Sequence, residues 1–154
     1  FLTSKSYRNR DRGYKKLNKN WNSKYQEQIE QVWIKFHDNK CLDLIINYFP
    51  AEFLYNNHMD LIPYAESYQI SRLFINLSKE RPHAIGILKK IDPISYAYVL
   101  VKINKTISNK DAREILKEKM KDEKIGLLLW CFGKMGKWDI LVDYIEKLPQ
   151  RVHK

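Results

Sequence analysis

Residues Ser67–Lys90 read SYQISRLFINLSKERPHAIGILKK, and they align with Ser95–Glu118, SYAYVLVKINKTISNKDAREILKE, at a shift of 28 residues. Eight positions are identical: a Ser-Tyr pair at the start of one helical pattern, an Ile-Asn pair near its end, and Ala-x-x-Ile-Leu-Lys inside a second pattern. A fixed period of this length, built from two helices, is typical of stacked helical-hairpin arrays. Such arrays more often present binding surfaces than catalyse reactions.

The apolar pattern repeats on both sides of these two segments, with less identity. A single hairpin would leave an apolar face in water, and stacking on its neighbours would bury that face. The sequence therefore predicts an all-α, right-handed solenoid of about four stacked hairpins, over residues 24–49, 63–91, 93–121 and 123–148, with an insertion after the first. An ordinary helical bundle with an accidental period is the alternative.

Helix-start signals support this assignment. Asp92 followed by Pro93 supplies an acidic cap and then proline at the first helical position, and Ser108 with Asp111 resembles a capping box. Other expected signals are Asn39 as the N-cap of a helix over Cys41–Phe49, a short helix over Ala51–Asn56, and Pro63 opening a helix to about Ser78. No window shows sustained strand alternation, so we expect no sheet.

Most of the net charge of +10 lies near the N-terminus. Residues 1–24 hold eight basic side chains and one acidic side chain, whereas the other 130 residues hold 20 basic and 17 acidic ones. We therefore divide the chain into a basic aromatic arm (residues 1–23), a helical-repeat domain (24–150) and a short tail (151–154). The chain begins at Phe1, which is consistent with a removed presequence or with a longer parent protein.

Aromatic residues are spaced through the charge of this arm, including Tyr14 and Trp21. Basic side chains neutralise phosphates and aromatic rings stack on bases, so this composition indicates nucleic-acid contact. The alternative is a solvated tail that docks on the body through Tyr14 and Trp21. For Trp21, the sequence leaves open whether it anchors the arm or stacks on a ligand.

The stretch ISYAYVLVKINKTISNKDAREILKEKMKDEK (residues 94–124) resembles a pentatricopeptide repeat, and LLLWCFGKMGKWDILVDYIEKLPQRV (residues 127–152) is similar to it. The resemblance covers about residues 63–150, at a period of 28–29 residues, and tetratricopeptide hairpins share much of the apolar pattern. It implies that each repeat reads one nucleotide through the residue after its tyrosine and through its last residue. The matching positions are Gln69, Ala97 and Gly126 for the first role and Asp92 for the second.

Lysines recur near the ends of the second helices, where stacking would align them into a basic ridge along a phosphate backbone. A favourable interaction with the negative ends of the helix dipoles is the alternative explanation. Together with the arm and the positions from the resemblance, they complete the set of expected nucleic-acid contacts: Lys5, Arg8, Arg10, Arg12, Tyr14, Lys15, Lys16, Lys19, Trp21, Lys24, Gln69, Lys89, Lys90, Asp92, Lys117 and Lys121.

Signals for catalysis are weak throughout the chain. The four histidines are scattered, and no histidine or cysteine pair has the spacing of metal ligands. We expect no metal, no cofactor and no enzymatic activity. Cys41 and Cys131 are expected in the core, as are Trp33, Trp130 and Trp138.

The expected function is RNA binding without catalysis, within an organellar ribonucleoprotein such as a ribosome or an RNA-maturation complex. The alternative is a protein-interaction scaffold of tetratricopeptide type. The longest apolar run, Ile125–Phe132, has eight residues against the roughly 20 that span a bilayer, so no membrane span is expected. The buried cysteines indicate a reducing compartment, and the basic N-terminus suggests the mitochondrial matrix.

Overall fold

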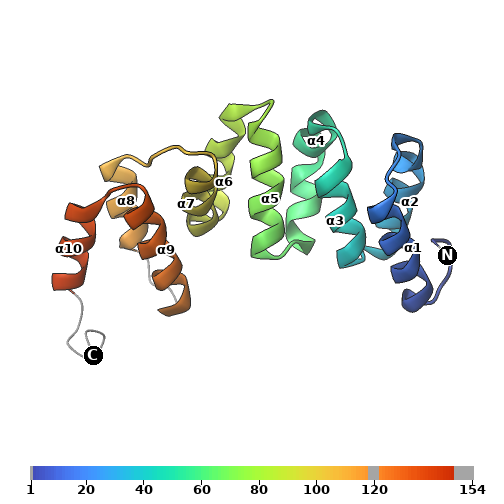
Figure 1. The fold of residues 1–154 in the computed structure, drawn as a ribbon, viewed down its shortest axis with the longest axis horizontal. Coiled ribbons are helices and arrows are strands. Elements are labelled where there is room, and N and C mark those ends of the chain that lie inside the picture. Colours follow the sequence, from blue (N-terminus) through green and yellow to red (C-terminus); the bar gives the residue numbers. More distant parts are fainter. Residues whose placement is uncertain (1, 118–121, 148–154) are drawn as a thin grey trace. The chain divides into compact units, whose positions relative to one another are not determined.

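The computed structural model describes residues 2–117 and 122–147. Within these ranges the regular structure consists of α-helices and short 3-10 turns, without a strand, which confirms the all-α prediction (Figure 1). None of the described helices combines the length and the apolar character needed to cross a bilayer. The chain divides into two compact units, Phe1–Ala84 and Ile85–Lys154.

The first unit is organised around its third helix. Its helices are α1 (Tyr7–Lys19), α2 (Gln26–Phe36), α3 (Asn39–Tyr48), α4 (Ala51–Leu61) and α5 (Ser67–Ser78). Helix α3 packs against the other four, and its apolar residues Leu42, Ile45 and Ile46 are almost completely buried. Helix α3 has only ten residues, but it is covered on several sides and therefore supplies much of the core of this unit.

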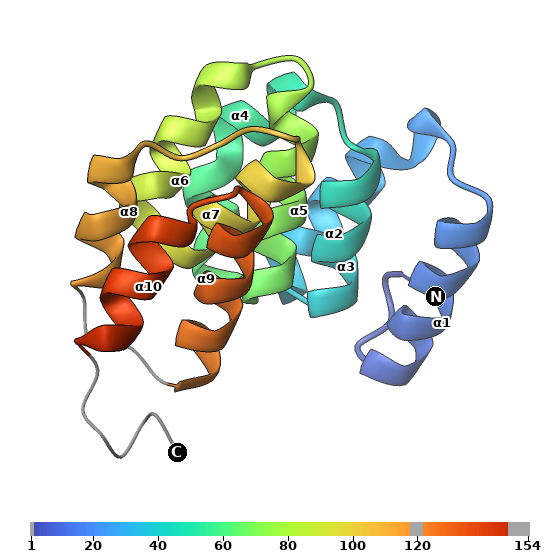
Figure 2. The ribbon, with the colours of Figure 1, turned by 60° about the vertical axis from the view of Figure 1, so that its left-hand side comes forward.

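The second unit contains α6 (Ile85–Ile91), α7 (Pro93–Lys102), α8 (Asn109–Leu116), α9 (Asp122–Lys134) and α10 (Trp138–Glu146) (Figure 2). Helix α7 packs against α6 and α9, while α10 packs against α8 and α9. Ala97 of α7 and Leu128 and Phe132 of α9 are fully buried. The turn between α9 and α10 includes Gly136 at φ +73°, a backbone conformation that favours glycine.

Two predicted helix starts are confirmed. The Asp92 carboxylate accepts hydrogen bonds from the Ser95 backbone nitrogen at 3.2 Å and from its hydroxyl at 2.7 Å, with Pro93 at the first position of α7. The Ser108 hydroxyl accepts from the backbone nitrogen of Asp111 at 3.1 Å at the start of α8. The local chemistry of the chain therefore fixes both helix starts.

Three other boundaries differ from the sequence expectation. Helix α5 begins at Ser67, because Glu66 and Gln69 form a capping box, whereas Pro63 lies in a separate 3-10 turn. Helix α4 extends to Leu61, past the expected end at Asn56. Asn39 is the first residue of α3 and not its cap. Asp38 holds the cap position, but its carboxylate bonds elsewhere.

Burial confirms some of the expected core and corrects the rest. Cys41, Cys131 and Trp33 are buried, as expected. Trp130 and Trp138 are 43% and 63% exposed, so their assignment to the core is wrong. Both lie on helical apolar stripes, but the outer faces of α9 and α10 are not covered by another described helix.

Candidate nucleic-acid interface

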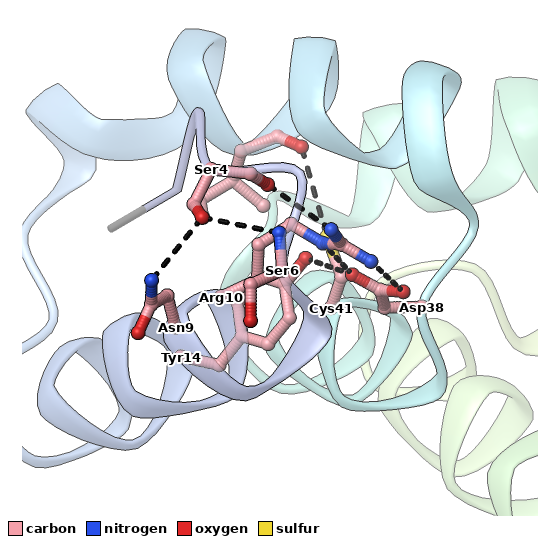
Figure 3. A network of polar contacts seen from close by, with 8 residues as sticks. Ser4, Ser6, Asn9, Arg10, Tyr14, Asp38 and Cys41 are labelled. Carbon is pink, nitrogen blue, oxygen red and sulfur yellow. Dashed lines mark hydrogen bonds and ion pairs between the residues drawn. The ribbon is translucent and has the colours of Figure 1, made fainter.

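The N-terminal segment is a helix that packs on α3 as part of the first unit, rather than a separate arm. Two of its expected ligand-binding residues, Arg10 and Tyr14, are buried and point toward Asp38 (Figure 3). Arg10 donates to the two Asp38 carboxylate oxygens, at 2.7 Å from Nε and 3.2 Å from Nη2. The Tyr14 hydroxyl donates to the same carboxylate at 2.6 Å. These side chains therefore hold α1 in place, and both are almost completely buried.

The environment of this network explains its protonation states. Burial by itself would raise the pKa of Asp38, but the hydrogen bonds from Arg10 and Tyr14 and the charge of Arg10 hold it below its ordinary value. Burial, followed by the hydrogen bond to Asp38, raises the pKa of Tyr14. The Arg10 guanidinium also lies 3.7 Å from the centre of the Phe36 ring. The pair is therefore charged and the phenol neutral at ordinary pH.

Trp21 anchors the chain that follows α1. Its ring stacks on Tyr48 at a centroid distance of 5.1 Å and an interplanar angle of 10°, and it contacts Phe49 at 5.9 Å. The Tyr48 hydroxyl donates to the backbone oxygen of Asn18 at 2.8 Å, which ties the end of α1 to α3. Of the two roles that the sequence leaves open for Trp21, the structure places it in the anchoring one.

The remaining basic residues of the N-terminal segment are exposed. Arg8, Arg12 and Lys16 follow one another at four-residue spacing, so they share one face of α1. Lys15 forms an ion pair with Asp11 at 3.1 Å, and Lys24 lies over the Tyr25 ring at 5.2 Å. The exposed set consists of Lys5, Arg8, Arg12, Lys15, Lys16, Lys19 and Lys24.

The two expected base-reading side chains are engaged inside the protein. Gln69 is 1% exposed, and its amide bonds to Asn39, to Asp43 and to the backbone of Glu66. Asp92 caps α7. Among the other two positions that the resemblance supplies, Ala97 is buried and Gly126 is exposed. The structure therefore gives Gln69 and Asp92 structural roles.

The expected lysine ridge belongs to the second unit. Lys89 donates to Asp111 at 2.6 Å, and this hydrogen bond holds the pKa of Asp111 below its ordinary value. Lys90 and Lys117 are exposed. Lys121 lies outside the described residues. The candidate set is thus divided between the two units.

A groove of about 280 Å³ crosses the first unit between α1, α3 and α5. Three cationic side chains border it, Lys15, Lys40 and Arg72, one from each helix. Asp43 and the amides of Asn18 and Asn47 also line it, and the buried Tyr14 and Leu44 form part of its wall. The remaining lining residue is Tyr68, whose side chain is 54% exposed.

The contacts around the groove orient its polar groups. Arg72 Nη1 donates to Asn47 Oδ1 at 3.1 Å. Asp43 Oδ1 accepts from Gln69 Nε2 at 2.9 Å. Burial, then Asp43 and Glu66, raise the pKa of Tyr68, so its hydroxyl stays protonated. The groove therefore presents hydrogen-bond donors, one carboxylate and an aromatic ring.

The sequence expectations include Lys15 but miss the other exposed residues of this groove. A usable signal is present, because Lys15, Asp43 and Arg72 follow one another at intervals of 28 and 29 residues, and Asn18 and Asn47 lie 29 apart. Equivalent positions of successive hairpins lie on one surface. The sequence expectation begins the repeat at residue 24 and treats the preceding segment as an arm, so it does not compare Lys15 and Asn18 with the later positions.

The described residues provide little for metal or thiol chemistry. No group of three or more His, Cys, Asp or Glu side chains in residues 2–117 and 122–147 is arranged to hold a metal ion. Burial raises the pKa of Cys41 to about 12 and that of Cys131 to about 11, so both thiols stay protonated and unreactive at ordinary pH. No family model, curated protein or solved structure matches the chain.

Proposed function

We propose that this chain is a non-catalytic RNA-binding protein built from helical hairpins. The observation that carries the proposal is the groove between α1, α3 and α5, which combines Lys15, Lys40 and Arg72 with the half-exposed ring of Tyr68. Cations supply the sequence-independent affinity for phosphates, and an exposed ring supplies a stacking surface for a base. The exposed basic residues of α1 extend the positive charge beyond the groove.

The helix contacts support a repeat in which α1 takes part. Helices two positions apart in the chain pack together: α1 with α3 and α3 with α5 in the first unit, and α7 with α9 and α8 with α10 in the second. Hydrogen bonds join these pairs at sequence separations of 28 or 30 residues, as in Arg10–Asp38, Asn39–Gln69 and Asn109–Lys137. Some helices that are adjacent in the chain also pack together, namely α2 with α3, α3 with α4 and α9 with α10, as expected for helical hairpins.

An organellar ribonucleoprotein is the assembly that we propose for the chain. The support is the concentration of exposed basic residues on α1, which suits binding to an RNA already folded in a larger particle. Within such a particle, affinity for phosphates would be shared between α1 and the groove. The proposal contains no catalytic step.

Salt-dependent binding tests the RNA proposal. In a titration with a labelled single-stranded RNA of about 16 nucleotides, affinity should fall steeply between about 50 and 200 mM salt. Because α1 is part of the first unit, its deletion would confound binding with unfolding. The sharper variant replaces the exposed Arg8, Arg12 and Lys19 with glutamine. It should bind more weakly, and its salt slope should be shallower by about 0.7 for each phosphate that the variant no longer neutralises.

A matched control removes the same charge elsewhere, by replacing Lys105, Lys110 and Lys124 of the second unit with glutamine; all three are exposed. The control should bind nearly as the unmodified protein does. If the unmodified protein does not bind RNA, or binds it independently of salt, the proposed function is wrong. Equal reductions in affinity in both variants would mean that net charge, and not α1, determines the affinity.

A second candidate function, a protein-interaction scaffold, is favoured by one observation. Helices α9 and α10 expose five large apolar side chains, each by between 40% and 63% of its surface: Leu127, Trp130, Trp138, Val142 and Ile145. An apolar surface with exposed tryptophans is typical of protein-binding sites. This surface belongs to the second unit, so the two functions would use different helices.

A further inference from the structure

We propose that the outer face of α9 and α10 binds an amphipathic helix of another protein, which carries Lys or Arg side chains along one flank of its apolar stripe. This site lies in the second unit, so the inference goes beyond RNA binding and does not depend on it. Three features carry it: the apolar side chains that α9 and α10 expose, the acidic side chains beside them, and the way in which the helices of this unit pack.

The exposed apolar side chains form one surface across two neighbouring helices. On α10, Trp138, Val142 and Ile145 lie four and three residues apart and therefore share one face. Helix α9 lies beside α10 (Figure 2), and the Trp138 ring reaches it, since a Cβ atom added at Gly133 would lie 3.5 Å from that ring. Trp130 precedes Gly133 by three residues, so it lies on the same side of α9. Two partly exposed tryptophans are typical anchors of a protein interface.

A row of acidic side chains runs beside the apolar row of α10. Asp139, Asp143 and Glu146 are exposed, and each follows a member of the apolar row by one residue, so the two rows are adjacent along the helix. The sequence of α10, WDILVDYIE, contains no basic residue, although the protein carries a net charge of +10. Lys147 pairs with Asp143 at 3.1 Å, but both side chains are exposed and such pairs contribute little. The acidic row therefore favours a partner with a basic flank.

The packing of this unit favours a helix as the bound element. Helix α7 packs on α9 and α8 packs on α10, so helices two positions apart lie against each other. A helix laid along the outer face of α9 and α10 would repeat this arrangement. Its apolar residues at positions i, i+4 and i+7 would have the same spacing as the apolar row of α10. Within residues 2–117 and 122–147 there is no strand whose edge could bind an extended peptide.

A second copy of this chain fits the surface poorly. Helix α1 exposes a basic face that could pair with the acidic row, but Tyr7 is its only exposed large apolar side chain. It would therefore leave Trp138 and its apolar neighbours against charged groups. Antiparallel pairing of two α10 helices would cover the apolar rows, but it would bring the two acidic rows together. The bound helix needs an apolar stripe and a basic flank at once.

Three labelled peptides of about 18 residues test the proposal by fluorescence anisotropy with the full chain. The first places Leu at the spacing i, i+4, i+7 on an Ala background, with Lys along one flank. The second has Glu in place of each Lys, and the third has the composition of the first in an order that destroys the stripe. The Lys peptide should bind at least about tenfold more tightly than either of the others. The net charge of +10 favours the Glu peptide, so this order would report the acidic row and not the overall charge.

A variant of the apolar row tests where the peptide binds. Trp138→Ala should weaken binding of the Lys peptide at least about tenfold. Its control is Ile34→Ala, which removes a similarly exposed apolar side chain from α2 of the first unit and should leave binding unchanged. Circular dichroism establishes that both variants are folded.

A variant of the acidic row tests the choice of partner charge. It combines Asp139→Asn, Asp143→Asn and Glu146→Gln. This variant should lose the preference for the Lys peptide over the Glu peptide, because the stripe still binds but the flank no longer selects. The control neutralises three exposed acidic side chains of the first unit and should keep the preference: Glu27→Gln, Glu52→Gln and Glu80→Gln.

Three outcomes would overturn the proposal. Failure of all three peptides to bind would mean that the surface does not take an amphipathic helix. Equal or tighter binding of the Glu peptide would mean that the acidic row does not select the partner. Self-association in sedimentation velocity that Trp138→Ala abolishes would assign the surface to contacts between copies of this chain. RNA binding is measured separately and should be the same for Trp138→Ala as for the unmodified protein, so the two proposals can fail independently.

Discussion

The two units join their helices by different chemistry. In the first unit, α1 meets α3 through the buried Arg10–Asp38 ion pair and Tyr14, and α3 meets α5 through the amides of Asn39 and Gln69. In the second unit, α7 meets α9 through buried apolar residues such as Ala97 and Phe132, and the polar contacts Lys89–Asp111 and Asn109–Lys137 are only partly buried or exposed. Hydrogen bonds are directional, so the polar contacts restrict how α1, α3 and α5 can slide past one another, whereas apolar contacts are less restrictive.

The exposed surfaces differ in the same way. The first unit presents cations, amides and a tyrosine around a groove, while the second presents tryptophans and aliphatic side chains on α9 and α10. A precise groove requires fixed helix positions, which the buried polar network supplies. Three experiments test this contrast between the buried polar network and the exposed apolar surface.

The largest effect is expected from Asp38→Ala. The variant leaves the Arg10 guanidinium buried without its carboxylate, and removing one partner of a buried pair should reduce the free energy of unfolding by about 3 kcal/mol. Urea denaturation followed by circular dichroism measures this change. The double variant Arg10→Met/Asp38→Leu should be clearly more stable than Asp38→Ala, because it leaves no unpaired charge. A double variant as unstable as the single one would contradict the account.

A smaller effect is expected from acid. The folded pKa of Asp38 lies below its ordinary value of 3.8, so the network stabilises the fold fully above about pH 4 and this stabilisation is lost as the pH falls through the folded pKa. Urea midpoints measured from pH 7 down to pH 3 should therefore fall more steeply for the unmodified protein than for Asp38→Asn. Parallel curves for the two proteins would mean that Asp38 does not account for the acid sensitivity.

The smallest effect on stability is expected from Trp138→Ala. The side chain is 63% exposed, so its removal should change the free energy of unfolding by less than about 0.5 kcal/mol, although tryptophan is the largest side chain. Thermal denaturation measures this change. A decrease of several kcal/mol would show that Trp138 is covered by other residues. A stable Trp138→Ala protein would in turn serve to test the apolar surface of the second unit for binding to a protein partner.

Local signals predict the helices well, since caps and prolines act within a few residues of one another. Asp92 with Pro93 and Ser108 with Asp111 are recognisable for this reason, and both starts are observed. The apolar neighbours of Cys41 and Cys131 likewise place both residues correctly in the core. The predicted start of α5 is wrong because Glu66 and Gln69 form a capping box that outweighs the signal of Pro63.

The candidate site is predictable only in part. Arg10, Tyr14 and Gln69 have the chemistry of ligand-binding residues, but each bonds to a partner that lies 24 to 30 residues away in the chain. Asp38 is not recognisable as the partner of Arg10, because nothing in its own neighbourhood distinguishes it from a helix cap. Trp130 and Trp138 fit an apolar stripe, and the stripe does not reveal whether another helix covers it.

The order of residues along the chain is enough to establish that the protein is helical, where most of its helices begin, and that its pattern recurs at a period near 28 residues. These properties depend on neighbouring residues and on spacing. The packing of the helices, in contrast, settles which charges of α1 are buried in the Arg10–Asp38 network, and that Lys15, Lys40 and Arg72 border one groove. The physical reason is that burial and charge pairing depend on contacts between helices, which the pattern of a single helix does not specify.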